Sequence, residues 1–286
     1  MDLEVSRLGL DLTGPLPPYG DSVLHRALHD EVTLFRIPLG DAGRGARHGL
    51  RRVGLGSEVT LVLVGVLPPG SAAEAPRLLD RARQELSIPH RLLLEVREPD
   101  LTLVRSTLLA EEASVAPAHR TGIGVGIDPP LTGGAGENRA DFVSVPHSLW
   151  GPGIRLSPDS GFRVGILARD PWGGPAGLVD PLEYSPNPTR PPLPVPVSRL
   201  RKEAERWIGW SDLVRLEGRP LPEIAVRYAL DTPGVSAALL PLPTPELWLA
   251  ARNATTNGPL SARAREWILR QGPAPDPRFS PEGAQP

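Results

Sequence analysis

Cysteine is absent from this chain of 286 residues, and lysine is nearly absent. Without cysteine the protein has no disulfide, no thiolate nucleophile and no zinc–thiolate site. Lys202 is the only lysine among 31 basic residues, so arginine supplies almost all of the positive charge. The soft metal ligands that remain are six scattered histidines, and we therefore expect no metal site.

The sequence also lacks a strong net charge and a long apolar run. The formal net charge is -2, which gives no bulk field that would attract nucleic acid or an anionic membrane. No apolar run approaches the roughly 20 residues that span a bilayer, and the first residues lack a signal-peptide pattern. We expect a cytoplasmic protein with no nucleic-acid or membrane partner, and the sequence leaves its oligomeric state open.

Proline and glycine are abundant, at 36 and 30 residues. Segment 180–197 is dense in proline, which predicts an extended loop. Segment 271–286 has little to bury, which predicts a disordered tail. The excess of arginine over lysine, with so much proline and glycine, is typical of a GC-rich bacterial genome such as that of an actinobacterium.

Short apolar runs alternate with helical stretches along most of the chain. This alternation favours a parallel α/β fold, and the chain length suits one closed barrel. Seven runs are clear and an eighth, near 10–13, is weak, so we predict a single (β/α)8 barrel over residues 1–270. The clear runs are 32–37, 59–66, 91–96, 122–127, 142–145, 162–168 and 236–240.

The clearest unit is 219–254, which predicts a helix, a strand and a second helix. Apolar residues recur at helical spacing from Leu221 to Tyr228. Segment 235–240 is continuously apolar, as in a strand buried on both faces. Thr244-Pro245-Glu246 supplies a hydroxyl N-cap, a proline at the first helical position and an acid in the first turn.

The sequence of this unit resembles the last unit of the aldo/keto reductases, where a motif like LAxxALRWxLxxPGVxxxIPGxxxPEQLxxN leads into the final barrel helix. The resemblance covers roughly 3–270 and implies a (β/α)8 TIM barrel of aldo/keto reductase type. It also implies an N-terminal hairpin plugging the barrel bottom, formed by 3–10 followed by Gly14-Pro15. In the family a mobile segment covers the cofactor where 180–197 stands here.

The family's catalytic tetrad of Asp, Tyr, Lys and His is not matched. Arg36 stands at the aspartate of FFDTAxxYG, and no tyrosine follows it. Val64 stands at the lysine and Arg97 at the histidine of HxPD. Most positions that hold NADPH in the family are also replaced, so we predict no cofactor; they are Gly124 to Ile127, Ser144, Arg169, Ala250 and Ala251.

Arg36, Arg97 and Arg169 replace groups that the family directs into the barrel mouth. Three converging guanidinium groups would repel one another unless acids balance them, so they predict a clamp for a small-molecule substrate bearing a carboxylate or phosphate. The alternative is an internal salt-bridge network, with Glu95 among the internal partners. Asp128 could contribute at the mouth.

Four side chains are candidates for acid or base chemistry: His147, Asp170, His48 and Glu95. Histidine titrates near neutrality, although a lone histidine is more often structural. Trp172 could form an aromatic wall for a substrate or cap the barrel.

These replacements predict a repurposed non-redox enzyme that acts on an anionic small molecule: a cyclase, dehydratase, isomerase or lyase, with natural-product biosynthesis as the suggested setting. The alternatives are a catalytically inactive binding or regulatory subunit and an atypical NADPH-dependent reductase.

Overall fold

A computed structural model describes residues 5–54, 60–87, 90–97, 100–114, 124–128, 140–149, 165–173 and 210–271. The proline-rich segment 180–197 and segment 272–286 lie outside these residues, so the loop and tail remain predictions. Gln271 is the last residue of a helix. The extent of the single domain, 1–270, is likewise a prediction.

Eight parallel strands close into a barrel in chain order, which confirms the predicted fold. Each strand pairs with its sequence neighbour, and β1 closes the barrel against β8. The strands are β1 (Leu8–Asp11), β2 (Leu34–Pro38), β3 (Leu61–Val66), β4 (His90–Arg97), β5 (Gly124–Asp128), β6 (Phe142–Pro146), β7 (Gly165–Arg169) and β8 (Val235–Pro241).

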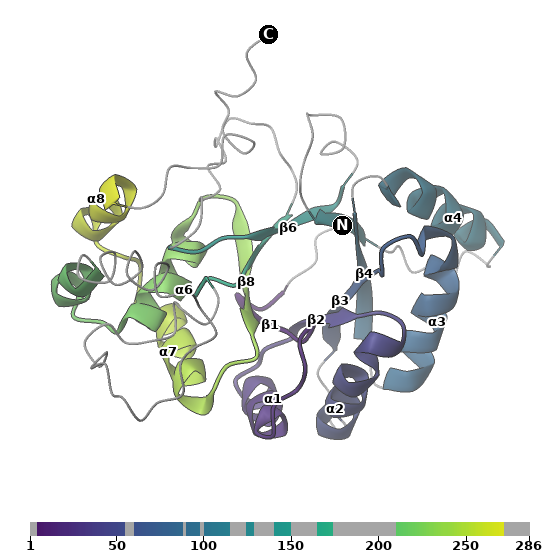
Figure 1. The fold of residues 1–286 in the computed structure, drawn as a ribbon, viewed down its shortest axis with the longest axis horizontal. Coiled ribbons are helices and arrows are strands. Elements are labelled where there is room, and N and C mark those ends of the chain that lie inside the picture. The colour runs from purple at the N-terminus through teal and green to yellow at the C-terminus, as the bar shows by residue number, and fades with distance from the viewer. Residues whose placement is uncertain are drawn as a thin grey trace, which may run out of the picture.

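Helices surround the barrel, and α3, α2, α1 and α7 follow one another around its outer surface in Figure 1. They are α1 (Gly20–His29), α2 (Arg44–Gly54), α3 (Ala75–Leu86), α4 (Leu101–Ser114), α6 (Leu221–Asp231), α7 (Pro245–Thr256) and α8 (Ala262–Gln271). Short 3-10 turns, η1 (Asp41–Gly43) and η2 (Ala72–Glu74), precede α2 and α3. Residues 210–217 are also helical. In the described part of the chain, no helix has the length and apolarity needed to cross a bilayer.

The strands are apolar on both faces because each face packs into a different core. One face meets the helices. The other fills the barrel interior, where side chains from five strands form a separate cluster: Leu34, Val62, Val64, Phe142, Leu167, Ala237 and Leu239. Gly126 makes room there, since a Cβ on it would lie 2.4 Å from the Phe142 ring.

The predicted N-terminal hairpin is wrong for the residues that the structure describes. Leu8–Asp11 is a barrel strand, paired in parallel with β2 and β8. Its interior-facing positions carry Gly9 and Asp11 instead of apolar side chains, so the strand was hard to recognise. Gly9 is required by packing, because a Cβ would lie 2.7 Å from Leu239.

The last unit forms as the sequence predicted. The Thr244 hydroxyl accepts a hydrogen bond from the Leu247 amide at 3.3 Å and caps α7, with Pro245 in its first turn. The side chain of Trp248 then reaches α1, where its Nε1 donates to Asp30 at 2.8 Å. This contact joins the last strand–helix unit to the first.

Candidate functional site

The carboxyl ends of the strands form the mouth of the barrel, the place where such barrels carry their chemistry. Register places Asp11 opposite Arg36 on the neighbouring strand. Arg36 shares its strand face with the interior residue Leu34, and Glu95 shares its face with Leu93. Three strands, β1, β2 and β4, therefore point charged side chains toward one place.

Arg36 is held between two carboxylates. Its Nε and Nη2 donate to Glu95 at 2.9 and 2.5 Å, a bidentate pair, and its Nη1 donates to Asp11 at 2.8 Å. Arg36 is 5% exposed and Glu95 is 0% exposed. Burial alone would lower the pKa of Arg36, but the bonds to Glu95 and Asp11 outweigh it and raise that pKa above its ordinary value.

Thr13 extends this cluster to the surface. Its hydroxyl donates to Asp11 Oδ1 at 2.7 Å and accepts from Arg36 Nη1 at 3.4 Å. The Thr13 side chain is exposed while Arg36 is buried. The structure thus brings a hydroxyl, a carboxylate and a cation together at the mouth.

Sequence reasoning missed Asp11 and Thr13. The available signal was Asp11-Leu12-Thr13 at the end of the weak first strand, because an acid and a hydroxyl two residues apart share one strand face. Pairing with Arg36 depends on the β1–β2 register, which no local pattern specifies.

The predicted clamp of three arginines does not form around Arg36, whose charge is already balanced by Glu95 and Asp11. Arg97 is exposed at the end of β4, and Arg169 is half-buried at the end of β7. Asp128 ends β5, and its backbone lies opposite Arg97, but its side chain is outside the described part. For Arg36 and Glu95 the structure matches the alternative of an internal salt bridge.

The predicted acid and base residues lie apart from one another. Both carboxylate oxygens of Glu95 accept hydrogen bonds from Arg36, so this side chain is already occupied by an internal partner. His48 is exposed on α2, outside the barrel. Asp170 is half-buried just after β7, and its amide donates to the Leu239 carbonyl. The catalytic roles of these residues remain untested predictions.

His147 packs against α6 rather than among the mouth residues. Its Nε2 lies 2.8 Å from the Thr232 hydroxyl, and its ring stacks on Tyr228 at a centroid distance of 5.1 Å. Burial lowers the pKa of His147 from 6.5 to about 4, so the ring is neutral at physiological pH. A neutral imidazole of this kind supports packing more readily than general acid catalysis.

Trp172 is 0% exposed, and its role as a substrate wall stays a prediction. Its Nε1 donates to the Pro222 carbonyl at 3.1 Å and ties the end of β7 to the start of α6. The other interpretation made from the sequence, that this tryptophan closes packing around the barrel, agrees with the geometry.

Ser144 carries an unsatisfied polar atom on the same strand face as the interior residue Phe142. Its Oγ has no hydrogen-bond partner among the described residues, and the residue is 0% exposed. An unpaired buried hydroxyl costs roughly 1–3 kcal/mol, so a polar ligand group reaching it would recover that energy.

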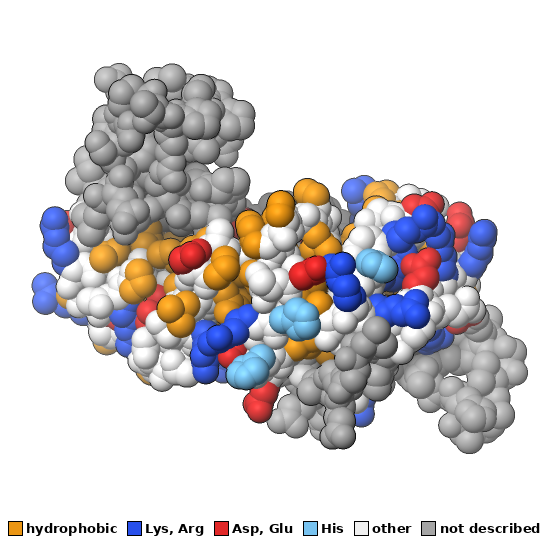
Figure 2. Space-filling view, turned by 90° about the horizontal axis from the view of Figure 1, so that it is seen from below, with side chains coloured by type: hydrophobic (Ala, Val, Ile, Leu, Met, Phe, Trp, Pro, Cys, Tyr) orange, Lys and Arg blue, Asp and Glu red, His pale blue; other side chains and the backbone are white. Residues whose placement is uncertain are grey.

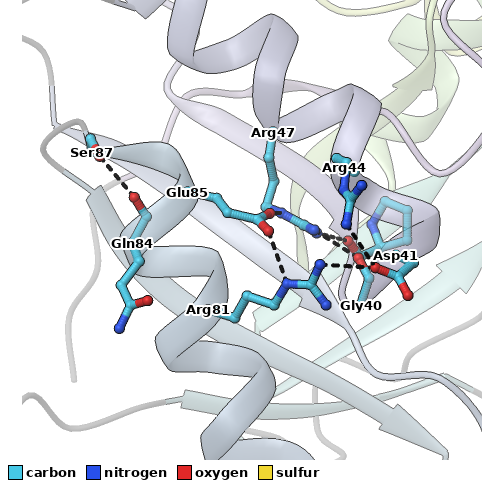
Figure 3. A network of polar contacts seen from close by, with 9 residues as sticks. Gly40, Asp41, Arg44, Arg47, Arg81, Gln84, Glu85 and Ser87 are labelled. Atoms are coloured by element: carbon cyan, nitrogen blue, oxygen red, sulfur yellow. Dashed lines mark hydrogen bonds and ion pairs between the residues drawn. The ribbon is translucent and has the colours of Figure 1, made fainter.

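A second polar network fixes the loop that follows β2 (Figure 3). Arg47 is 1% exposed; it donates to the Pro38 and Gly40 carbonyls at 3.0 and 2.7 Å and to Glu85 at 2.5 Å. Arg81 joins Glu85 to Asp41, each at 2.9 Å. Because every charge here has an opposite partner, the network supports the barrel structurally by joining α2 and α3 to the end of β2.

In the described part of the chain, no three His, Asp or Glu side chains gather where they could hold a metal ion.

No protein-family model matches the chain, and no curated protein matches it in sequence. Solved structures do match in fold. Glycerol dehydrogenase AKR11B4 from Gluconobacter oxydans gives a TM-score of 0.71 at 14% identity, over 96% of this chain and 95% of that one. The holo form of aldo-keto reductase AKR11C1 from Bacillus halodurans gives 0.67 at 15% identity, over 98% and 97%. An aldo-keto reductase from Klebsiella pneumoniae in complex with NADPH gives 0.65 at 16% identity, over 96% and 94%.

These likenesses show that the chain has the aldo/keto reductase barrel fold. They also overturn the prediction of a non-redox cyclase, dehydratase, isomerase or lyase. The neighbours are enzymes named as reductases and a dehydrogenase, one of them in complex with NADPH. That prediction assumed that Arg36 binds an anionic substrate. Its charge is instead balanced inside the protein by Asp11 and Glu95, so the physical basis of the prediction weakens as well.

Proposed function

We propose that this chain is an atypical oxidoreductase on the aldo/keto reductase fold, in which the family's Asp-Tyr-Lys-His tetrad and most NADPH-binding residues are replaced. The observation that carries the proposal is the contact of the Thr13 hydroxyl with Asp11 and Arg36 at the barrel mouth. The tetrad also combines a hydroxyl, a carboxylate and a cation. Here the hydroxyl and the carboxylate come from Thr13 and Asp11 at the end of β1, and the cation comes from Arg36, which stands at the family's aspartate position.

Reduction of a carbonyl needs a hydride and a proton. The Thr13 hydroxyl is exposed, and its proton already points to Asp11 Oδ1. A threonine hydroxyl is too weak an acid to act alone. In the oxidative direction it passes the proton of the alcohol to the Asp11 carboxylate, and in the reductive direction Asp11 first takes a proton from solvent, which returns through Thr13 to the substrate oxygen. Arg36 Nη1 donates to Asp11 at 2.8 Å and to the Thr13 hydroxyl at 3.4 Å, so it holds the carboxylate and the hydroxyl in place beside each other.

One residue of this chain, Ser144, fits a nicotinamide group. The orphaned Ser144 hydroxyl would bind the carboxamide of a nicotinamide, at the position where the family carries an amide side chain. When bound, the dinucleotide supplies the hydride.

At the start of α7 the Glu246 carboxylate bonds its own backbone amide and Thr244, which lowers the pKa of Glu246. A further phosphate is therefore disfavoured at this helix end, and both NADH and NADPH belong in the test.

The neighbours guide the choice of substrates. One is named a glycerol dehydrogenase, so small polyols and their aldehydes are the first compounds to test. The assay follows nucleotide absorbance with glycerol in the oxidative direction and with small aldehydes in the reductive direction. We expect slow, nucleotide-dependent turnover that stops without the carbonyl compound.

Binding gives a readout that is independent of turnover. Titration of the chain into NADH or NADPH, followed by nucleotide fluorescence, is expected to give saturable binding. Replacing Ser144 with Ala should weaken that binding by about tenfold, because it removes the hydroxyl that meets the amide. Ser106→Ala, on the exposed face of α4, is the matched control and should have no effect. The proposal would be refuted if neither NADH nor NADPH bound to the chain at millimolar concentration.

A further inference from the structure

A hollow of about 350 Å³ lies on the outside of the barrel, between α1 and α7. Its walls are apolar and come from both helices: Val23 from α1 and Pro245, Trp248 and Leu249 from α7. Arg26 and Arg252 border it. Figure 2 shows the face of the molecule that carries these helices, with hydrophobic side chains beside basic ones and histidines.

Asp30 organises the polar side of this hollow. Its side chain is 5% exposed, and it accepts hydrogen bonds from Trp248 Nε1 at 2.8 Å and from Arg26 Nε at 3.3 Å. Arg252 Nη1 lies 3.6 Å from its other oxygen. Burial raises the pKa of Asp30, but Trp248, Arg252 and Arg26 outweigh it and lower that pKa. The carboxylate is thus ionised, and it brings both arginines to the same place.

Two guanidinium groups share one carboxylate, which leaves the hollow with an excess of one positive charge. The side chains of Arg26 and Arg252 are 56% and 46% exposed, so both remain accessible to a ligand from solvent. The other titratable group beside Asp30 is His29, whose Nδ1 lies 3.6 Å away on an 80% exposed side chain. Leu249, at 53% exposed, extends the apolar wall to the surface beside these charges.

From this arrangement we propose that the α1–α7 hollow binds an amphipathic anion, a molecule with an apolar chain that ends in a carboxylate or phosphate. The apolar walls take the chain, and the outer nitrogens of Arg26 and Arg252 bind the headgroup by charge-assisted hydrogen bonds. A cavity of this size holds a small ligand. The site lies on the helix layer, apart from the barrel mouth, and does not depend on the redox proposal.

The test measures binding of dodecanoate and dodecyl phosphate to the full chain by calorimetry, below their micellar concentrations. Dodecanol and inorganic phosphate are probed in parallel. We expect one or both amphipathic anions to bind, and the two arms distinguish a carboxylate from a phosphate headgroup. Dodecanol and inorganic phosphate are expected to bind at least about tenfold more weakly, because each lacks one half of the interaction.

Variants locate the site. The double change Arg26→Gln and Arg252→Gln should weaken dodecanoate binding by about tenfold or more. The matched control is Arg215→Gln with Arg270→Gln, two exposed arginines that each pair with an acid on their own helix, and it should bind as the unchanged chain does. Leu249→Glu is a second variant, which leaves Asp30 and its partners intact and should also weaken binding by placing a negative charge on the wall.

Equal affinity of the arginine double variant and the control would overturn the proposal. So would dodecanol or inorganic phosphate binding as tightly as the amphipathic anions. A dimer of the free chain that Leu249→Glu dissociates would show instead that the hollow is an interface between two copies.

Discussion

Arg36 holds its guanidinium between Glu95 and Asp11 inside the barrel, and three buried or half-buried charges are therefore mutually dependent. A buried ion pair adds little net stability over an apolar pair, but breaking it leaves an uncompensated charge. The same contact explains why arginine at this position need not bind a substrate.

Glu95→Gln tests this dependence. We expect the free energy of unfolding, measured in urea, to fall by about 3 kcal/mol, because Arg36 then keeps only Asp11 as its ionic partner. Glu266→Gln, which breaks an exposed pair with Arg270, should cost less than about 1 kcal/mol. Replacing Arg36 and Glu95 together with leucine should cost less than Glu95→Gln alone. Equal effects of Glu95→Gln and Glu266→Gln would contradict the buried pair.

His147 gives the protein a pH dependence whose sign follows from its burial. The pKa of the folded state is about 4, below the ordinary value of 6.5, so the unfolded chain binds a proton first as pH falls. The stabilising contribution is full above pH 6.5 and is lost between pH 6.5 and 4. It amounts to roughly 3 kcal/mol.

His147→Leu should therefore flatten the stability profile between pH 6.5 and 4, as measured by urea unfolding at several pH values. The exposed His48 is the control, and His48→Leu should leave the slope unchanged. A His147→Leu profile as steep as that of the unchanged chain would rule out this histidine as the source.

At the scale of elements, β5 and β6 pack closely enough that one methyl group matters. Gly126→Ala should lower the free energy of unfolding by about 1–3 kcal/mol, because the new Cβ would lie 2.4 Å from the Phe142 ring. Phe142→Leu in the same chain should recover part of that loss by opening space. The control is Gly45→Ala on α2, where a Cβ meets nothing within 4 Å. A loss at Gly126 no larger than at Gly45 would show that the ring moves freely.

Seven of the strands could be predicted because their residues are mostly apolar, with the buried charges Arg36 and Glu95 as exceptions. The Thr244 cap could be predicted because its chemistry is local. The first strand was obscured for the opposite reason, since its interior positions hold Gly9 and Asp11. The contacts that define the mouth and the α1–α7 hollow join residues 25, 59 and 218 positions apart. Only the barrel register brings such residues together, so composition and spacing could not show them.

At the scale of the whole molecule, the fold is shared with known enzymes, whereas the proposed chemistry depends on residues of this chain. The barrel matches two enzymes named as aldo-keto reductases and one named as a glycerol dehydrogenase over nearly its full length, at 14–16% identity. A hydroxyl, a carboxylate and a cation meet at the ends of β1 and β2. The proposed redox account therefore depends on Thr13, Asp11 and Arg36.

Transfer of deuterium from nucleotide deuterated at nicotinamide C4 to the carbonyl carbon of a small aldehyde, followed by mass spectrometry of the alcohol, tests this account most directly. The account predicts deuterium in the alcohol, with a rate that falls by about 10²-fold or more in Thr13→Val. Thr107→Val, at a half-buried threonine of α4, should not change the rate. A chain that transfers no deuterium from NADH or NADPH, or a Thr13→Val variant as fast as the unchanged protein, would contradict it.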